Sequence, residues 1–208
     1  MAYLILVRHG RSEWNDKGLW TGLNDVPLTD QGKEEAKQTS LALRDIEIDK
    51  AFTSGLKRAQ ETLDIILKNL GIQVEVVKDK RLNERDYGIY SGKNKWEVKE
   101  QIGEVEFNKL RRSWDYPVPN GESLKQVYER VIPYYESEIK PILLQGKNIL
   151  ITAHGNSLRS LAKFIENISD EKISELEIGT AEAVVYDIDS KTGKLISKEV
   201  RSKNEKKV

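Results

Sequence analysis

The chain has 208 residues, its 34 basic residues balance 34 acidic ones, and it contains no cysteine. The length fits one domain with a substantial core. Zero net charge argues against binding to nucleic acid or a membrane surface, because no global field attracts a polyanion. The lack of cysteine excludes disulfides, thiol catalysis and cysteine-based metal sites, which fits a cytoplasmic protein. No apolar run approaches the ~20 residues that span a bilayer.

The first half of the chain alternates short apolar runs with helical patterns. Residues 3–7 are apolar throughout and predict a buried strand. Thr29 is a plausible N-cap for the helical pattern that follows it, and Gly71 closes another helical pattern. Further strands are expected over 51–54 and 73–77, and helices over 33–45, 56–70, 94–102 and 106–114.

The second half repeats this alternation. Ser123 is expected to cap a long helix over 122–144, which Pro133 and Pro141 should bend or divide. Residues 149–153 predict a second buried strand. Further helices are expected over 158–165 and 170–176, and a hairpin is expected from strands over 183–188 and 195–200 with a turn at 192–193.

This order of elements predicts an α/β fold: a three-layer α/β/α sandwich around a mostly parallel central sheet. We expect one catalytic domain over 1–201 and a flexible polar tail over 202–208. In such sheets the ligand site lies beyond the carboxyl ends of the strands. The two histidines of the chain, His9 and His154, each follow a predicted buried strand directly, so the sequence places both at that edge.

Arg8-His9-Gly10 is the first motif that indicates chemistry. A neutral imidazole is a nucleophile, and a neighbouring cation favours the neutral form and binds an anion. The guanidinium fork matches phosphate oxygens, so the implied electrophile is a phosphoryl group. A hydrogen-bonded core histidine is the simpler interpretation, but Arg8 would then also need burial, and His154 repeats the setting.

Three further charged positions suit a phosphorylated ligand. Lys57-Arg58 open a helix after a strand, where the backbone also favours an anion, although a solvated helix face explains such a pair alone most of the time. Glu84, in RLNERDYG, can give or take the proton of a substrate hydroxyl. Arg111-Arg112, in a polar helix, can bind a second anionic group, although an Arg pair alone has low specificity.

These stretches together resemble a known family. LVRHGRSEWN, LWTGLNDVPLTDQGKEEA, TSGLKRAQET, RLNERDYGIYSGKNK, LRRSWD and ILITAHGNSLRSLAKFIENIS are similar to the cofactor-dependent phosphoglycerate mutases of the histidine phosphatase superfamily. The resemblance covers nearly the whole chain in order. It implies interconversion of 3-phosphoglycerate and 2-phosphoglycerate in glycolysis and gluconeogenesis, through a phosphohistidine that 2,3-bisphosphoglycerate primes. It implies no metal, and it allows a homodimer.

The resemblance also implies roles by position. His9 matches the histidine that is phosphorylated, Glu84 matches the proton donor and acceptor, and the phosphoryl group is surrounded by Arg8, Arg58 and His154. The substrate-contacting positions are matched by Asn15, Thr21, Gly22, Arg85, Tyr87, Lys95, Arg111, Arg112, Gly155 and Asn156.

The chain departs from the family at several places. Arg11 stands where Glu or Gln is usual, and Asp86 stands where the pattern has His. The segment after Asp115 and the C-terminal tail are shorter, and PNGES resembles the phosphatase branch. The alternative activity is therefore hydrolysis of small phosphomonoesters on the same scaffold. A non-catalytic phosphate-binding module is a third hypothesis, disfavoured because His9 and Glu84 are both present.

Overall fold

A six-stranded sheet in the order β3-β2-β4-β1-β5-β6 forms the centre of the molecule. This computed structural model describes residues 1–201; the tail expected over 202–208 lies outside the described residues. The strands are β1 (Ala2–Arg8), β2 (Lys50–Thr53), β3 (Glu75–Lys78), β4 (Ile149–Ala153), β5 (Ala183–Ile188) and β6 (Leu195–Arg201). β1, β4, β2 and β3 run parallel, and β5 runs antiparallel to both of its neighbours. The prediction of a mostly parallel sheet is confirmed.

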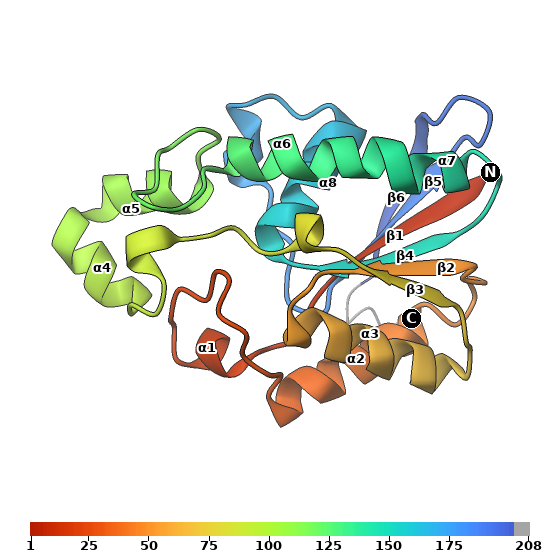
Figure 1. The fold of residues 1–208 in the computed structure, drawn as a ribbon, viewed down its shortest axis with the longest axis horizontal. Helices are drawn as coiled ribbons and strands as arrows, with labels where there is room; N and C mark the ends of the chain where they lie inside the picture. Colours follow the sequence, from red (N-terminus) through yellow and green to blue (C-terminus); the bar gives the residue numbers. More distant parts are fainter. Residues whose placement is uncertain (202–208) are drawn as a thin grey trace, which may run out of the picture.

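Helices cover both faces of the sheet (Figure 1). α2 (Asp30–Ala42) and α3 (Lys57–Leu70) lie on one face, and α6 (Leu124–Tyr134) and α8 (Gly155–Glu166) lie on the other. Alternate side chains of β1 enter the two cores, because side chains of a strand point to opposite faces. Ile5 and Val7 pack on the α2–α3 side, and Leu4 and Leu6 pack on the α6–α8 side. The three-layer prediction is therefore confirmed.

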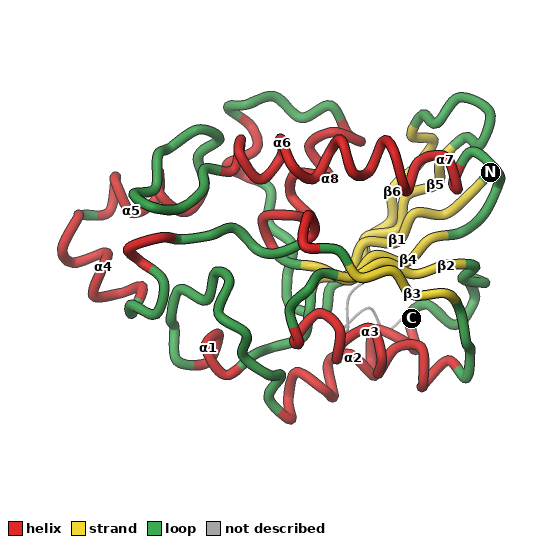
Figure 2. The backbone as a smooth tube through the Cα atoms, viewed as in Figure 1, coloured by secondary structure: helices red, strands yellow, loops and turns green. Residues whose placement is uncertain are grey.

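A small lobe lies beyond the carboxyl edge of the sheet. It contains α4 (Lys95–Ile102) and α5 (Glu104–Arg112), joined to the sheet layers by loops (Figure 2). A separate apolar cluster holds the lobe together, formed by Trp20, Val98, Phe107, Leu110 and Val118. The lobe thereby forms one wall of the space at the strand ends. No helix described over residues 1–201 combines the length and apolarity that a membrane span requires.

The long helix expected over 122–144 is divided. Ser123 caps it as predicted, because its Oγ accepts the N–H of Gln126 at 3.2 Å. α6 then passes into a π-helical segment (Tyr135–Ile139) and a short helix, α7 (Lys140–Leu143). Pro141 has no N–H to donate, so the regular i→i−4 ladder cannot continue through it.

Other element bounds differ from the sequence predictions at helix ends. The helix expected over 170–176 is only a 3₁₀ turn (Lys172–Glu175). A four-residue helix, α1 (Glu13–Asp16), was not predicted, nor were the 3₁₀ turns Lys80–Leu82 and Gly88–Tyr90. Such short helices carry too few residues to show a helical period. α8 begins at Gly155, three residues before the predicted start, immediately after β4.

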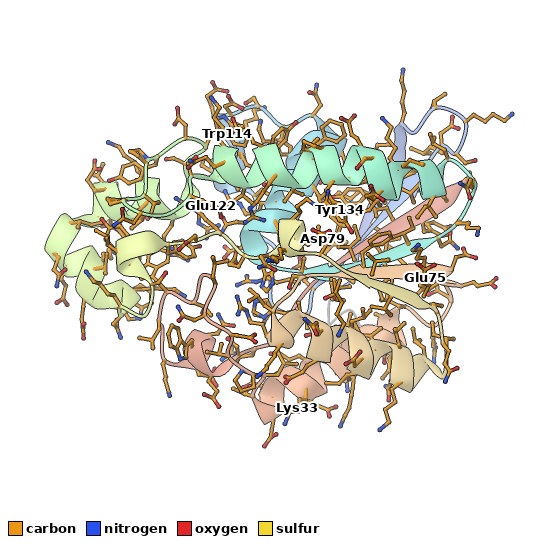
Figure 3. The ribbon with its side chains drawn as sticks, viewed as in Figure 1. Lys33, Glu75, Asp79, Trp114, Glu122 and Tyr134 are labelled. Carbon is orange, nitrogen blue, oxygen red and sulfur yellow. The ribbon has the colours of Figure 1, made fainter. Side chains whose placement is uncertain are left out.

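α2 and α3 each have one face exposed to solvent and one face buried against the sheet. Lys33, on the outer side of α2, pairs with Asp30 at 3.0 Å in solvent (Figure 3). On α3, by contrast, Ala59, Leu63 and Ile66 are fully buried against the sheet. Exposed ion pairs of this kind contribute little, so burial of the inner stripe holds these helices in place.

Two glycines bring the loop after β1 against the start of α2. A Cβ at Gly32 would lie 2.0 Å from the carbonyl oxygen of Arg11, and a Cβ at Gly10 would lie 2.3 Å from that of Gly32. Thr29 closes the contact, since its N–H donates to the Arg11 carbonyl at 2.9 Å. Gly10 is therefore required for the close approach of α2.

We predict that Gly32→Ala lowers both the free energy of unfolding and the kcat of the phosphoglycerate reaction that the sequence leads us to expect. The added methyl meets backbone atoms that no rotamer change can move, and such overpacking costs about 1–3 kcal/mol or more of unfolding free energy. Urea unfolding and steady-state assays measure the two effects.

Gly71→Ala is the control. Its Cβ would meet nothing within 4 Å, and its φ is +69°. We expect it to lose about 1 kcal/mol through the left-handed backbone alone and to keep full turnover. Equal turnover in both variants would show that the Gly10–Gly32 contact does not shape the site.

Candidate active site

His9 and His154 meet at the carboxyl edge of the sheet. β1 and β4 are neighbours, and their register places Arg8 opposite Ala153, so both strands end level. The ring centroids are 5.0 Å apart at an interplanar angle of 58°. Both side chains are buried. The structure thus brings together the two histidines that the sequence placed at this edge of the sheet.

The partners of His9 define which nitrogen carries the proton. Nδ1 lies 2.7 Å from the carbonyl oxygen of Gly10, which can only accept, so Nδ1 is the donor. Nε2 then has a free lone pair and accepts from Nε of Arg58 at 3.4 Å. Burial lowers the pKa of His9 well below its usual value, and the charges of Arg58 and Arg8 lower it further. The ring is thus neutral at pH 7, and a neutral imidazole is able to act as a nucleophile.

Arg58 is a fully buried guanidinium beside that nucleophile. It stands on the first turn of α3 and donates to the carbonyls of Asn24 and Gly22, both at 2.8 Å. Burial lowers its pKa to about 10, which leaves it charged at neutral pH. Its neighbour Lys57 is exposed, so the solvated-face alternative applies to Lys57 and not to Arg58.

Arg8 and Glu84 face each other across the backbone of Gly155. A Cβ at Gly155 would lie 3.7 Å from both Arg8 Nε and Glu84 Oε2. Arg8 donates through Nη1 to the Ile178 carbonyl at 2.7 Å, whereas its buried Nε has no partner within residues 1–201. Gly155 therefore leaves room for a ligand between a free guanidinium N–H and a carboxylate.

Glu84 is held through one oxygen and open at the other. Oε1 accepts the backbone N–H of Arg85 at 2.8 Å and both the backbone and side-chain N–H groups of Asn156 at 3.1 Å. Oε2 accepts no hydrogen bond from any residue between 1 and 201. This arrangement suits a group that exchanges a proton with a bound molecule.

His154 lies next to His9 but does not line the inner or the outer pocket. Its Nε2 lies 2.7 Å from the hydroxyl of Ser54, and its buried Nδ1 has no partner in the described part of the chain. Burial, followed by the charge of Arg58, lowers its pKa well below the usual value. The free Nδ1 is consistent with a polar contact to a group bound at His9.

Two adjoining pockets contain most of the predicted site residues. The inner pocket is lined by Arg8, His9, Asn15, Trp20, Thr21, Gly22, Arg58, Glu84, Tyr87 and Lys95. The outer pocket shares Arg8, Trp20, Glu84, Tyr87 and Lys95 with it and adds Arg111, Arg112, Gly155, Asn156, Arg159, Glu177 and Ile178. His154 and Arg85 line neither.

Cations in the outer pocket are free to bind an anion. Burial, with the charges of Arg111 and Arg8, lowers the pKa of Lys95 to about 8. Lys95 and Arg111 lie over Trp20 and Phe107, at 5.8 and 5.4 Å from the ring centroids. Neither has an acidic partner within 4 Å among residues 1–201. Arg112, in contrast, pairs with Glu177 at 2.9 Å.

Arg85 differs from the expectation. It is fully buried, and its guanidinium donates to the carbonyl of Glu122 and, at 2.9 Å, to that of Leu110. The side chain therefore ties its loop to α5 and to the segment before α6. Arg85 lines neither pocket, and its buried Nη2 has no hydrogen-bond partner among residues 1–201. The motif alone cannot reveal this, because side-chain direction in a loop depends on its neighbours.

The two departures from the family pattern lie outside both pockets. Arg11 pairs with Asp16 at 3.1 Å on the surface, and its backbone N–H donates to Glu35. Asp86 accepts the N–H of Gly88 at 2.8 Å within its own loop. Neither Arg11 nor Asp86 lines either pocket.

Sequence reasoning missed Trp20 and Arg159. Trp20 is buried and borders both pockets. Arg159 donates to Oδ1 of Asn156 at 3.1 Å, which directs the Asn156 amide N–H toward Glu84. Burial lowers the pKa of Arg159 to about 10. Its signal was present: Asn156 and Arg159 are three residues apart, and such residues share one face of a helix.

Within residues 1–201, no group of three or more His, Cys, Asp or Glu side chains is arranged to hold a metal ion.

Comparisons with known proteins agree with this geometry. Residues 4–200 match the model of the histidine phosphatase superfamily, branch 1. A Parvibaculum lavamentivorans protein named 2,3-bisphosphoglycerate-dependent phosphoglycerate mutase is 49% identical over 193 residues, 91% of this chain and 92% of that protein. A Cytophaga hutchinsonii protein of the same name is 47% identical over 191 residues, 92% and 90% of the two chains.

The solved structure named Bacillus stearothermophilus YhfR has a similar fold. Its TM-score is 0.82 at 25% identity, and the match covers 94% of this chain and 95% of that one. The sheet order and the helices on its faces therefore belong to an architecture that is already known.

We predict that the two buried histidines make the fold sensitive to mild acid. Their folded-state pKa values are lowered, so below about pH 6.5 the unfolded chain binds protons that the folded chain does not. Stability is then lost as pH falls, by about 1.4 kcal/mol per pH unit for each histidine. Urea unfolding between pH 7 and pH 5 measures the slope.

Carboxylates also contribute to the slope of unfolding free energy against pH. The variants His9→Gln and His154→Gln therefore isolate the contribution of each histidine. Each should reduce the slope by about 1.4 kcal/mol per pH unit. A slope unchanged in both would mean that the histidines are protonated in the folded protein.

Proposed function

Because this chain belongs to the histidine phosphatase superfamily, we propose that it is a 2,3-bisphosphoglycerate-dependent phosphoglycerate mutase. It interconverts 3-phosphoglycerate and 2-phosphoglycerate through a phosphohistidine. The observation that carries the proposal is the buried, neutral His9 between Arg58 and Arg8, with the open carboxylate oxygen of Glu84 beside it.

The short segment after Asp115 does not oppose the mutase assignment. The two relatives named as mutases match this chain over 92% and 90% of their own lengths, so they are similarly short. PNGES, at 119–123, supports the loop that carries Glu84. The N–H of Glu122 donates to the carbonyl of Asp86 at 2.9 Å, and the N–H of Asp86 donates to Oε2 of Glu122 at 3.0 Å. The passage therefore has a structural reason in either branch.

The site fits a ligand with several negative charges. Two acidic side chains face six basic ones: the acids are Glu84 and Glu177, and the bases are Arg8, Arg58, Lys95, Arg111, Arg112 and Arg159. When bound, 2,3-bisphosphoglycerate supplies the phosphoryl group that primes His9. Arg8 and Arg58 would hold the oxygens of that group, and Lys95 and Arg111 would hold the rest of the molecule.

The residues then act in one sequence. Glu84 accepts the proton of the substrate hydroxyl as that oxygen bonds to phosphorus and the bond between phosphorus and His9 Nε2 breaks. Glu84 returns the proton to the other ester oxygen as His9 takes the phosphoryl group back. His154, through Nδ1, and the buried guanidinium groups stabilise charge on the transferred group, so the chain itself provides the positive charge.

Interconversion of the phosphoglycerates belongs to glycolysis and gluconeogenesis, and we place it in the cytoplasm. The homodimer that the resemblance allows stays a prediction.

The decisive experiment follows both products at once. The protein is incubated with 3-phosphoglycerate and 2,3-bisphosphoglycerate while 2-phosphoglycerate and free phosphate are measured. We expect 2-phosphoglycerate to form, His9→Ala to abolish it, and mass spectrometry to find the phosphate on His9 and not on His154. Free phosphate without 2-phosphoglycerate would instead establish the hydrolytic alternative.

We predict different effects at Arg111 and Arg112. Arg111 has no acidic partner among residues 1–201, so Arg111→Ala should remove a charge-assisted contact to the substrate worth about 1.5–3 kcal/mol, a rise in KM of roughly 10-fold to 100-fold. Arg112→Ala should raise KM less, because Glu177 already holds that guanidinium. Steady-state assays compare the two, and equal KM values in both variants and wild type would make the pair a solvated helix face.

A further inference from the structure

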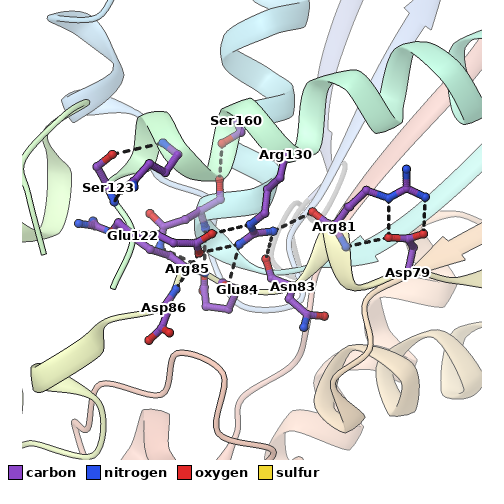
Figure 4. Close-up of polar contacts among 12 residues, drawn as sticks. Asp79, Arg81, Asn83, Glu84, Arg85, Asp86, Glu122, Ser123, Arg130 and Ser160 are labelled. Carbon is purple, nitrogen blue, oxygen red and sulfur yellow. Dashed lines mark hydrogen bonds and ion pairs between the residues drawn. The ribbon is translucent and has the colours of Figure 1, made fainter. Parts of the chain in front are cut away.

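Arg130 uses every N–H of its guanidinium group. Nε and Nη2 donate to the two carboxylate oxygens of Glu122, at 2.8 and 2.9 Å. Nη1 donates to the carbonyls of Arg81 at 2.8 Å and Asn83 at 3.1 Å, and Nη2 also donates to that of Glu84 at 3.0 Å. Because a guanidinium has five N–H groups, this set leaves none free (Figure 4).

Glu122 holds the same loop from its other end. Its Oε2 accepts the N–H of Asp86 at 3.0 Å, and its carbonyl accepts from the buried side chain of Arg85. Burial opposes ionisation of Glu122, but the hydrogen bond and charge of Arg130 outweigh burial, and its pKa lies below the usual value. Together the pair binds the backbone on both sides of Glu84.

The hydrogen bonds of Arg130 and Glu122 to the loop that carries Glu84 are important because this loop has no regular secondary structure. Residues 83–87 lie between two 3₁₀ turns and outside every strand, so no ladder fixes the backbone there. Asn156 fixes the Glu84 carboxylate only from the pocket side. The position of the Glu84 main chain therefore depends on the contacts that Arg130 and Glu122 make on the side of the loop away from the pocket.

Arg130 and Glu122 cannot touch a ligand at His9. Neither lines the inner or the outer pocket, and both border a separate groove on the opposite side of the loop. Glu122 precedes α6 and points toward this loop (Figures 3 and 4).

We propose that Arg130 and Glu122 are the positioning residues for Glu84, and that they set the distance between its open oxygen and the hydroxyl that exchanges a proton. The proposal rests on the mutase mechanism above. A group that transfers a proton must lie within hydrogen-bond reach of its partner, whereas phosphate binding by the arginines tolerates a small shift of this loop. Loosening the pair should therefore slow turnover more than it weakens binding.

The experiment measures kcat, KM and unfolding midpoints for Arg130→Lys. Lysine keeps the charge but cannot make five planar hydrogen bonds. We expect kcat to fall by roughly 10-fold to 100-fold, as for a small misplacement of a catalytic group. We expect KM to change by less than about threefold, because this loop holds the proton carrier and not the cations that bind substrate.

Arg201→Lys is the matched control. Arg201 also pairs with two carboxylates, of Asp45 and Glu199, and donates to the carbonyl of Ala42, but it lies at the end of β6 on the far edge of the sheet. It should lose comparable stability and keep wild-type kcat. A loss of kcat in both variants would reduce the effect of Arg130 to general stability.

A double variant separates positioning of Glu84 from every other role. Glu84→Gln alone should lower kcat about 10²-fold to 10⁴-fold, since the amide cannot exchange the proton. Once Glu84 is gone, adding Arg130→Lys should lower kcat no further. Multiplying effects would overturn the proposal.

Two further measurements allow the proposal to be tested even if Arg130→Lys does not fold or the protein is not a mutase. If Arg130→Lys does not fold, Glu122→Gln, which preserves volume, is compared with wild type in the same way. If wild type releases only free phosphate, the mutase proposal fails, and the same variants measured by phosphate release still decide whether Arg130 positions Glu84.

Discussion

Positive charge buried without a matching number of carboxylates is the constraint on which the rest of the site depends. Arg58 has no exposed surface, and its nearest fixed partners are carbonyl oxygens and the ring of His9. An unpaired buried charge is costly, so the surrounding backbone must point oxygens at it. That requirement explains why the loop at Gly22 and Asn24 folds over α3, and why an anion is the ligand that completes the pocket.

The central layers of the fold were predictable because their signals are local. β4 and β5 have the predicted bounds, and β1 extends one residue further at each end, because strands buried on both faces read as continuous apolar runs. The π-helical segment and the short α1 were not predictable in the same way. α1 depends on reciprocal contacts between Ser12 and Asn15, and these exist only once the loop has its final shape.

The sequence predicted most of the residues that line the two pockets, but it did not predict their contacts. The two histidines could be placed together because parallel neighbouring strands end at the same edge of a sheet. The direction of Arg85 and the grip of Arg130 on the loop could not be inferred, since both involve partners distant in sequence and main-chain carbonyls. A carbonyl has no residue type, so a motif cannot show which one a guanidinium will bind.

The contact between Gly10 and Gly32 has a consequence for hydrogen exchange. It locks the His9 loop to α2, while Arg58 comes from α3 and the Glu84 loop is held from α6. The pocket is thus assembled from both helical layers, so detachment of either layer in a subglobal opening dismantles it. Slowly exchanging amides in each layer should then report an opening that dismantles the site, and the fraction of molecules with a competent site should equal the fraction in which neither layer has opened.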